Sequence, residues 1–262
     1  MLIRIKFSKL GSLKFIGHLD VMRYFQKVLS RSGLPIKYTQ GFHPHQIMSF
    51  ASPLGVGLTS DGEYMDFELD EERSEDEIYS ALQSALTDGF KISKVTILNP
   101  RVLNVKKVSA MALVDSADYY IYMKNPSCAI KDETEGFESA FLKRMSAPEF
   151  VITKKTKTSE KEIDIKPYLY DFAFSFAAFL CNRTLEEAYK EALRCSLSEE
   201  QGIKLYLHLS AGSTMNLKPE IILEEILAGY TTQLNLNDFG IHRLEMYHSD
   251  EKGARIPLWD IR

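Results

Sequence analysis

The sequence predicts an α+β protein built from two tandem ferredoxin-like (RRM-like) units, each with the element order β-α-β-β-α-β. Segments in which apolar and polar residues alternate, typical of strands, lie between segments with apolar residues three and four apart, typical of helices. This order of strands and helices recurs in the second half of the chain, without similarity between the residues themselves. The 262 residues suffice for two small domains with buried cores.

The first predicted unit covers residues 1–100. Residues 2–8 alternate like a strand, and residues 17–33 have the apolar spacing of an amphipathic helix. Gly17 serves as the N-cap of this helix, and Gly33 ends it. The later elements are strand segments at 35–40 and 46–52, a glycine-rich connection at 53–62, a strand at 63–70, a helix at 74–89 capped by Ser74, and a strand at 91–98.

The second predicted unit covers residues 115–262 and follows a connection. It is longer than the first unit, because an additional helix is predicted at 183–196. Its other elements are strands at 118–124, 149–157, 161–165, 168–180, 203–210 and 241–248, and helices at 132–146 and 218–230.

Composition indicates a globular protein, with 45% hydrophobic and 26% charged residues. No apolar run approaches the roughly 20 residues of a membrane-spanning helix, and the N-terminus does not read as a signal peptide. We therefore expect a cytoplasmic protein with no membrane partner. The cysteines Cys128, Cys181 and Cys195 form no CxxC pair, which argues against a disulfide framework and against cysteine-built metal sites. We expect no cofactor.

Charge is distributed unevenly along the chain. Residues 1–60 contain eight Lys or Arg and a single acid, whereas residues 61–80 contain ten acids and a single Arg. The basic segment suits an anionic partner and the acidic segment a basic protein, although two solvated faces of opposite sign explain the pattern equally well.

The segment GFHPH at residues 41–45 contains two histidines two positions apart. In extended backbone, His43 and His45 point the same way, and Pro44 restricts the chain between them. His18, at the start of the first helix, is a third candidate. Three such histidines suit a zinc site, and His18 or His45 suits general acid or base catalysis. A polar turn with hydrogen-bonded histidines is the simpler interpretation.

A basic surface is predicted on the first unit. Its exposed aromatic residues Tyr38 and Phe42 are suited to stacking on bases, although the aromatic motif of RRM domains is absent. A solvated basic face without a partner is the alternative. The cations that could contact phosphates are Lys6, Lys9, Lys14, Arg23, Lys27, Arg31 and Lys37.

The segment SAGSTMNLKPE at residues 210–220 leads into a predicted helix. Its backbone N–H groups, with Lys218, could hold an anion. Alternatively Asn216 caps the helix and Pro219 lies near its first position. The common nucleotide-binding, hydrolase and zinc-protease motifs do not occur.

Several motifs resemble the radical SAM-linked protein family, a bacterial domain of unknown function. They are KLG, GHLD with a following Arg, GLP, GFHPH, PLGVG and EY, and, near the C-terminus, GSTMNLKPEIILEEIL and IHRLEMY. Gly17, His43 and Gln46 depart from the family, which usually has Ser, Asn and Pro there. The matching positions are Lys9, Gly11, His18, Asp20, Arg23, Gly33, Pro35, Gly41, Phe42, Pro44, His45, Pro53, Leu54, Gly57, Glu63, Tyr64, Asn216, Lys218 and Pro219.

The resemblance implies association with a separately encoded radical SAM enzyme, because this chain lacks the CxxxCxxC motif of such enzymes. It also implies RNA, either tRNA or rRNA, as the substrate class. We therefore expect a non-catalytic RNA-binding accessory protein. Arg23, Lys27 and Arg31 would contact phosphates, and His18, Phe42 and His45 would form a specific site.

Two alternatives remain open. Tandem ferredoxin-like units resemble the RNA-processing CRISPR nucleases, which would make the protein a metal-independent endonuclease using His18 or His45. The glycine-rich C-terminal loop typical of those nucleases is missing here. The other alternative is a protein-docking adaptor that uses the acidic residues 61–80.

Overall fold

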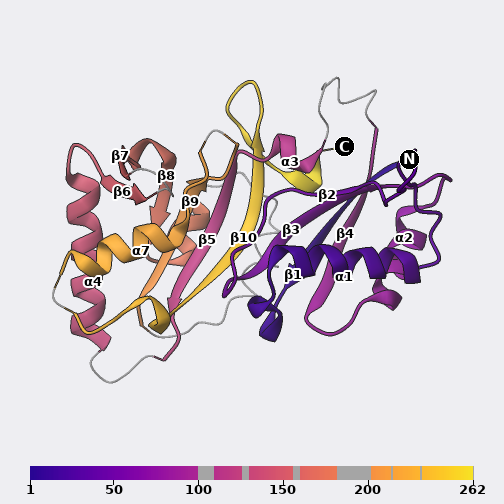
Figure 1. The fold of residues 1–262 in the computed structure, drawn as a ribbon. Coiled ribbons are helices and arrows are strands. Elements are labelled where there is room, and N and C mark those ends of the chain that lie inside the picture. Colours follow the sequence, from indigo (N-terminus) through magenta and orange to yellow (C-terminus); the bar gives the residue numbers. More distant parts are fainter. Residues whose placement is uncertain are drawn as a thin grey trace. The chain divides into compact units, whose positions relative to one another are not determined.

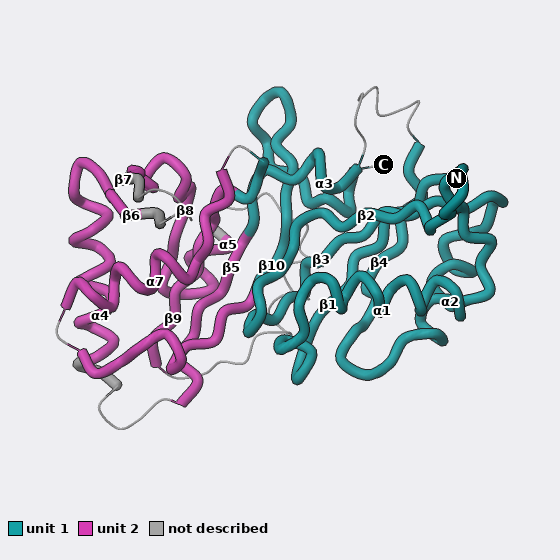
Figure 2. The backbone as a smooth tube through the Cα atoms, in the orientation of Figure 1, with its two compact units in different colours: residues 1–117, 211–213, 243–262 teal, residues 118–210, 214–242 magenta. Residues whose placement is uncertain are grey.

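The computed structural model has an α+β fold (Figure 1). The chain forms two compact units (Figure 2). The first contains residues 1–117, 211–213 and 243–262, and the second contains 118–210 and 214–242. The C-terminal segment thus belongs to the first unit, unlike the predicted division into 1–100 and 115–262. The structure describes residues 1–99, 109–125, 130–155, 160–181, 202–213, 215–230 and 232–261.

The first unit is a sheet with two helices on one face. The strand order is β4-β1-β3-β10, with β2 paired to β3 and β11 paired to β10. β1 is antiparallel to both β3 and β4. The elements are β1 (Leu2–Lys9), η1 (Gly11–Phe15), α1 (His18–Arg31), β2 (Met48–Phe50), β3 (Thr59–Glu68), α2 (Glu75–Ala85), β4 (Phe90–Leu98), α3 (Ala110–Leu113), the second half of β10 (Phe239–Ser249), β11 (Arg255–Pro257) and η4 (Leu258–Asp260).

An aromatic core lies between this sheet and α1. The apolar stripe of α1 is buried, as its spacing predicts. The Phe7 and Phe25 ring centroids are 4.5 Å apart, and Phe50 and Phe90 surround them. Ile3, Ile5 and Phe7 of β1 face this core. Side chains alternate along a strand, so the residues between them face the other side of the sheet.

That other side is also buried, and it carries ion pairs. Register places Arg4 opposite Asp66 and Lys6 opposite Tyr64 on β3. Arg4 donates to both Asp66 carboxylate oxygens, at 2.8 and 3.0 Å. Lys6 Nζ lies 2.7 Å from Glu245 Oε2. The lysine predicted to contact phosphate at position 6 is therefore engaged inside the protein.

The predicted strands at 35–40 and 46–52 are much shorter in the structure. Only Met48–Phe50 forms a strand, and isolated bridges join Ile36 to Leu69 and Tyr38 to Gln46. β3, in contrast, begins within the predicted glycine-rich connection. Gly62 lies inside it because a Cβ there would come within 2.7 Å of the Glu245 Cα, so the close approach of β10 requires glycine.

The second unit is a sheet of order β10-β5-β9-β8, with a separate β6-β7 hairpin. β8 and β9 are antiparallel. Its elements are β5 (Ser116–Met123, of which 118–123 belong here), α4 (Ile130–Ser146), β6 (Val151–Lys155), β7 (Glu160–Asp164), η2 (Lys166–Tyr168), β8 (Leu169–Ala173), α5 (Phe176–Cys181), β9 (Lys204–Ser210), α7 (Pro219–Ala228), η3 (Leu236–Asp238) and the first half of β10.

Two predictions for this unit are wrong. The predicted strand at 168–180 is β8 followed by α5, because the Ser175 hydroxyl accepts a hydrogen bond from the Ala178 N–H at 3.3 Å and starts a helical turn. Asn216 does not cap α7, whose N-cap is Lys218 with Pro219 as its first residue. The predicted helix at 183–196 lies outside the described residues.

No helix in the described ranges combines the length and the apolar character needed to cross a bilayer.

Candidate functional site

The corner at residues 38–46 is fixed against α1. The bridge between Tyr38 and Gln46 closes it. Gln46 Nε2 donates to the Gln26 carbonyl at 3.2 Å and to the Ser30 hydroxyl at 3.0 Å. Since Gln26 and Ser30 are one turn apart on α1, the corner has a defined position beside the middle of this helix.

The side chains of this corner face solvent. Phe42 is fully exposed, at 101% of its reference area, and Tyr38 is 44% exposed. His43 is also exposed. The His45 Nδ1 lies 3.0 Å from the Thr39 hydroxyl, so this imidazole is held in place. A fully exposed phenylalanine on a fixed corner is a costly feature that suits a contact with another molecule.

Two cations of α1 lie next to the corner. Positions 23, 26, 27 and 30 form one face of a helix, so Arg23 and Lys27 share the face that holds the corner. Both are exposed, and Arg23 makes only a 3.4 Å contact with Asp20. Arg31, predicted to join them, turns to the other side, where it donates to the Ala85 carbonyl of α2 at 2.9 Å.

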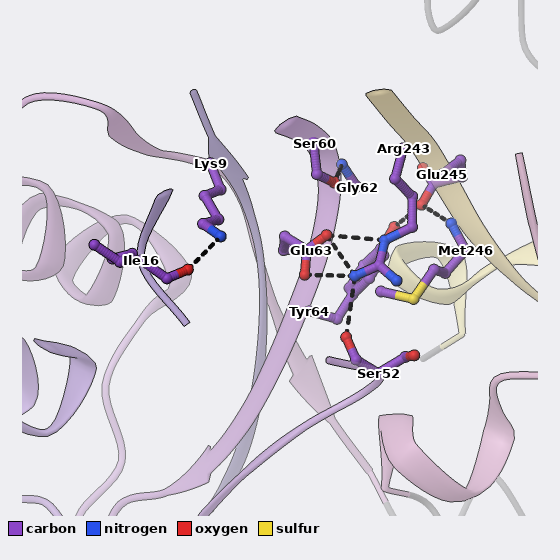
Figure 3. A network of polar contacts seen from close by, with 10 residues as sticks. All are labelled: Lys9, Ile16, Ser52, Ser60, Gly62, Glu63, Tyr64, Arg243, Glu245 and Met246. Atoms are coloured by element: carbon purple, nitrogen blue, oxygen red, sulfur yellow. Dashed lines mark hydrogen bonds and ion pairs between the residues drawn. The ribbon is translucent and has the colours of Figure 1, made fainter. Parts of the chain in front are cut away.

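We call Lys9, His18, Glu63 and Arg243 the ionic cluster of the first unit. Figure 3 shows the contacts of Lys9, Glu63 and Arg243. Arg243 of β10 donates to both carboxylate oxygens of Glu63, each at 2.6 Å, and to the Ser52 carbonyl at 3.0 Å. Lys9, at the end of β1, is 2% exposed, and its Nζ donates to the Ile16 carbonyl at 2.9 Å. His18, half-buried, turns its ring edge to Phe50 at a centroid distance of 5.5 Å.

The four ionisable groups of this cluster influence one another. Burial lowers the pKa of Lys9; the Glu63 carboxylate opposes this effect and the Arg243 guanidinium adds to it. Burial likewise lowers the pKa of His18, opposed by Glu63 and assisted by Lys9. Burial therefore disfavours the charged forms of Lys9 and His18, while the Glu63 carboxylate favours them.

The histidines predicted as a set are separated. His18 lies at the first turn of α1, whereas the corner with His43 and His45 is held at Gln26 and Ser30, about 12 to 18 Å further along the helix axis. Across the described ranges, no three His, Cys, Asp or Glu side chains are grouped to hold a metal ion. The zinc interpretation of His18, His43 and His45 thus has no geometric support.

The remaining predicted residues belong to neither the corner nor the ionic cluster. Lys37 is paired with Glu68 at 2.7 Å. Asp20 is exposed in the first turn of α1. Asn216 and Lys218 are exposed in the second unit, before α7.

Sequence reasoning missed Arg243 as a site residue. It is 180 positions from Glu63 along the chain, so no local spacing connects them. The available signal was a charged pair, Arg243 and Glu245, inside an otherwise apolar strand pattern. The buried contact of His208 with Asp118, 2.5 Å apart in the second unit, was missed for the same reason.

A family of uncharacterized proteins conserved in bacteria (DUF2344) matches residues 2–219. The chain belongs to this family. No curated protein matches the chain. The description of DUF2344 names no activity, so the radical SAM enzyme and RNA remain predicted partners.

Proposed function

We propose that the protein is an RNA-binding accessory protein that works with a separately encoded radical SAM enzyme acting on tRNA or rRNA. The observation that carries the RNA proposal is the fully exposed Phe42 on a corner fixed beside Arg23 and Lys27. We call Arg23, Lys27, Tyr38, Phe42, His43 and His45 the corner surface.

The corner surface has the groups that a single-stranded RNA segment needs. Phe42 and Tyr38 offer rings on which bases stack, a contact worth about 1–3 kcal/mol per base. Arg23 and Lys27 offer charge to the phosphates, and His43 can donate or accept hydrogen bonds at base edges. Because Gln46 fixes the corner in advance, little ordering entropy is lost on binding.

We also infer that both units are ferredoxin-like. In the first unit, the strands of the β-α-β-β-α-β series pair in the order fourth, first, third and second, since β2 pairs with β3. In the second unit, β5, β8, β9 and β10 pair in the same order. RNA-binding modules often use this arrangement of strands. The strand order therefore supports the RNA proposal by analogy of fold alone.

The radical SAM partner rests on the sequence motifs that resemble the radical SAM-linked family. The three cysteines of the chain lack the CxxxCxxC spacing. The iron–sulfur cluster would therefore reside on the partner, and this protein would present the RNA.

Fluorescence anisotropy with labelled tRNA and rRNA fragments tests the proposal. We expect binding at low ionic strength, and we expect Phe42→Ala to weaken it by roughly fivefold or more, because one stacked base is lost. The matched control is Tyr79→Ala, since Tyr79 is an exposed aromatic residue on α2, away from the corner.

Absence of RNA binding at low ionic strength would reject the proposal. Equal losses in Phe42→Ala and Tyr79→Ala would reject the corner surface as the place where RNA binds.

A further inference from the structure

The ionic cluster leaves one buried cation without a carboxylate of its own. Glu63 is engaged by Arg243 through hydrogen bonds to both of its oxygens. Lys9 is almost completely buried, and its hydrogen bond is to a neutral carbonyl, that of Ile16. An ammonium group has three N–H donors, and for the other two the described residues provide no acceptor. A buried cation in this state is costly unless an anion accompanies it.

Further donors lie next to Lys9. The Ile16 carbonyl that Lys9 contacts immediately precedes Gly17, the N-cap of the 14-residue helix α1. Gly17 has no side chain to cap the helix, and the first N–H groups of α1, those of His18 and Leu19, have no intrahelical acceptor. They also lie at the positive end of the helix dipole.

The His18 imidazole completes this set of donors. It is half-buried, and its only described contact is the edge-on packing against Phe50. The one acid in this turn, Asp20, is exposed and contacts Arg23. Its negative charge is therefore partly offset.

We propose that Lys9, His18 and the first turn of α1 bind a phosphate group. Lys9 Nζ lies at the carbonyl of Ile16, two residues before His18, so its ammonium lies near the start of α1, where the imidazole and two backbone N–H groups are also found. An anion with several oxygens can accept from more of these donors than a planar carboxylate can. Arg243 is paired with Glu63, so its charge is not counted toward the binding of the phosphate. Phe15, 68% exposed and next to Ile16 in sequence, offers a ring to the base of a nucleotide.

This phosphate site involves other residues than the corner surface, and it does not depend on the proposed function. A free phosphate ion, a mononucleotide and the 5′ end of an RNA all present the same phosphate chemistry to this site. The test therefore begins with inorganic phosphate alone.

Proton NMR of the His18 imidazole measures the binding on the unmodified protein. The resonance is assigned by its loss in His18→Gln. Phosphate is titrated at constant ionic strength, with sodium chloride as the balancing salt. We expect a saturable shift of the His18 resonance, together with a rise in the His18 pKa because the bound anion favours the imidazolium.

Lys9→Met keeps a long apolar side chain at this buried position and removes the ammonium charge. We expect it to weaken phosphate binding roughly tenfold or more, since a charge-assisted hydrogen bond is lost. The matched control is Lys37→Met, whose lysine is paired with Glu68 at the surface, and we expect it to bind phosphate like the unmodified protein. If Lys9→Met does not fold, the amide resonances of His18 and Leu19 in the unmodified protein decide, because both must shift with phosphate.

The source of the phosphate follows from the same titration with a nucleoside 5′-monophosphate and with 5′-phosphorylated and 5′-hydroxyl oligoribonucleotides. Tighter binding of the phosphorylated RNA assigns the site to RNA ends, and equal affinity for all phosphates assigns it to the free ion. No shift of the His18 resonance with any of these ligands would overturn the inference. RNA binding lost through Phe42→Ala with phosphate binding intact would separate this site from the corner surface.

Discussion

At the residue scale, Arg243 and Glu63 form a buried ion pair that is costly to break. Both are buried, and the pair links strands from distant parts of the sequence. Removing one member of such a pair leaves the other charged and without its partner in a medium that solvates it poorly. The pair therefore holds β10 to β3 mainly because separating the two charges is costly. Its net contribution to the free energy of folding is small by comparison.

We expect Arg243→Met to lower the free energy of unfolding by about 3–5 kcal/mol, because Glu63 is left buried and unpaired. Adding Glu63→Gln to Arg243→Met should recover most of this loss. Urea denaturation monitored by circular dichroism measures both variants.

The control for this prediction is Arg23→Met. The Arg23–Asp20 contact is exposed, so its loss should cost less than about 1 kcal/mol. A similar loss in Arg23→Met and Arg243→Met would contradict the account of the buried pair.

Single residues of the site were only partly predictable. Lys9 and His18 were selected from motifs, and the structure places both in one cluster. Their relation to Arg243 required the tertiary pairing of β10, which no spacing within the sequence reveals. Phe42 could be selected from the sequence as an aromatic residue in a polar corner, but the complete exposure of its side chain could not be predicted.

At the scale of elements, caps determined which predictions succeeded. α1 begins after Gly17, and Gly33 follows its end with φ +72°, a conformation that favours glycine. α2 begins after Ser74 in a capping box with Glu77. The strand predictions at 35–40 and 168–180 failed because alternation alone does not say whether a partner strand is available or whether a serine starts a helix.

We expect Ser74→Ala to lower the free energy of unfolding by about 1 kcal/mol, because the Glu77 N–H loses its acceptor and the capping box is broken. The matched control is Ser84→Ala at the other end of α2, where the hydroxyl donates to the Ala81 carbonyl and caps nothing. Thermal unfolding measures both, and equal effects would argue against the cap.

At the scale of the whole molecule, part of the uneven charge of the sequence is neutralised by ion pairs within the chain. Arg4 pairs with Asp66, Lys6 with Glu245 and Lys37 with Glu68. The sequence pattern suggests either partner-binding segments or two solvated faces of opposite sign, because the burial of charged strand residues leaves no local signal. The exposed cations that remain beside the corner are Arg23 and Lys27.

The α+β class followed from the sequence pattern, while the division into units did not. The return of residues 243–262 to the first unit depends on strand pairing between the two ends of the chain. It also brings η4 against the outer side of the sheet, where Arg4 donates to the Leu258 carbonyl.

The salt dependence of RNA affinity tests the central claim, RNA binding by the corner surface, most directly. It is measured for the unmodified protein and for the double variant Arg23→Gln/Lys27→Gln, with Lys143→Gln on α4 as the control for an exposed cation elsewhere. We predict that the logarithm of affinity falls linearly with the logarithm of salt concentration, and that the double variant reduces this slope by about two while the control leaves it unchanged. An identical slope and affinity in the unmodified protein and the double variant would contradict the claim.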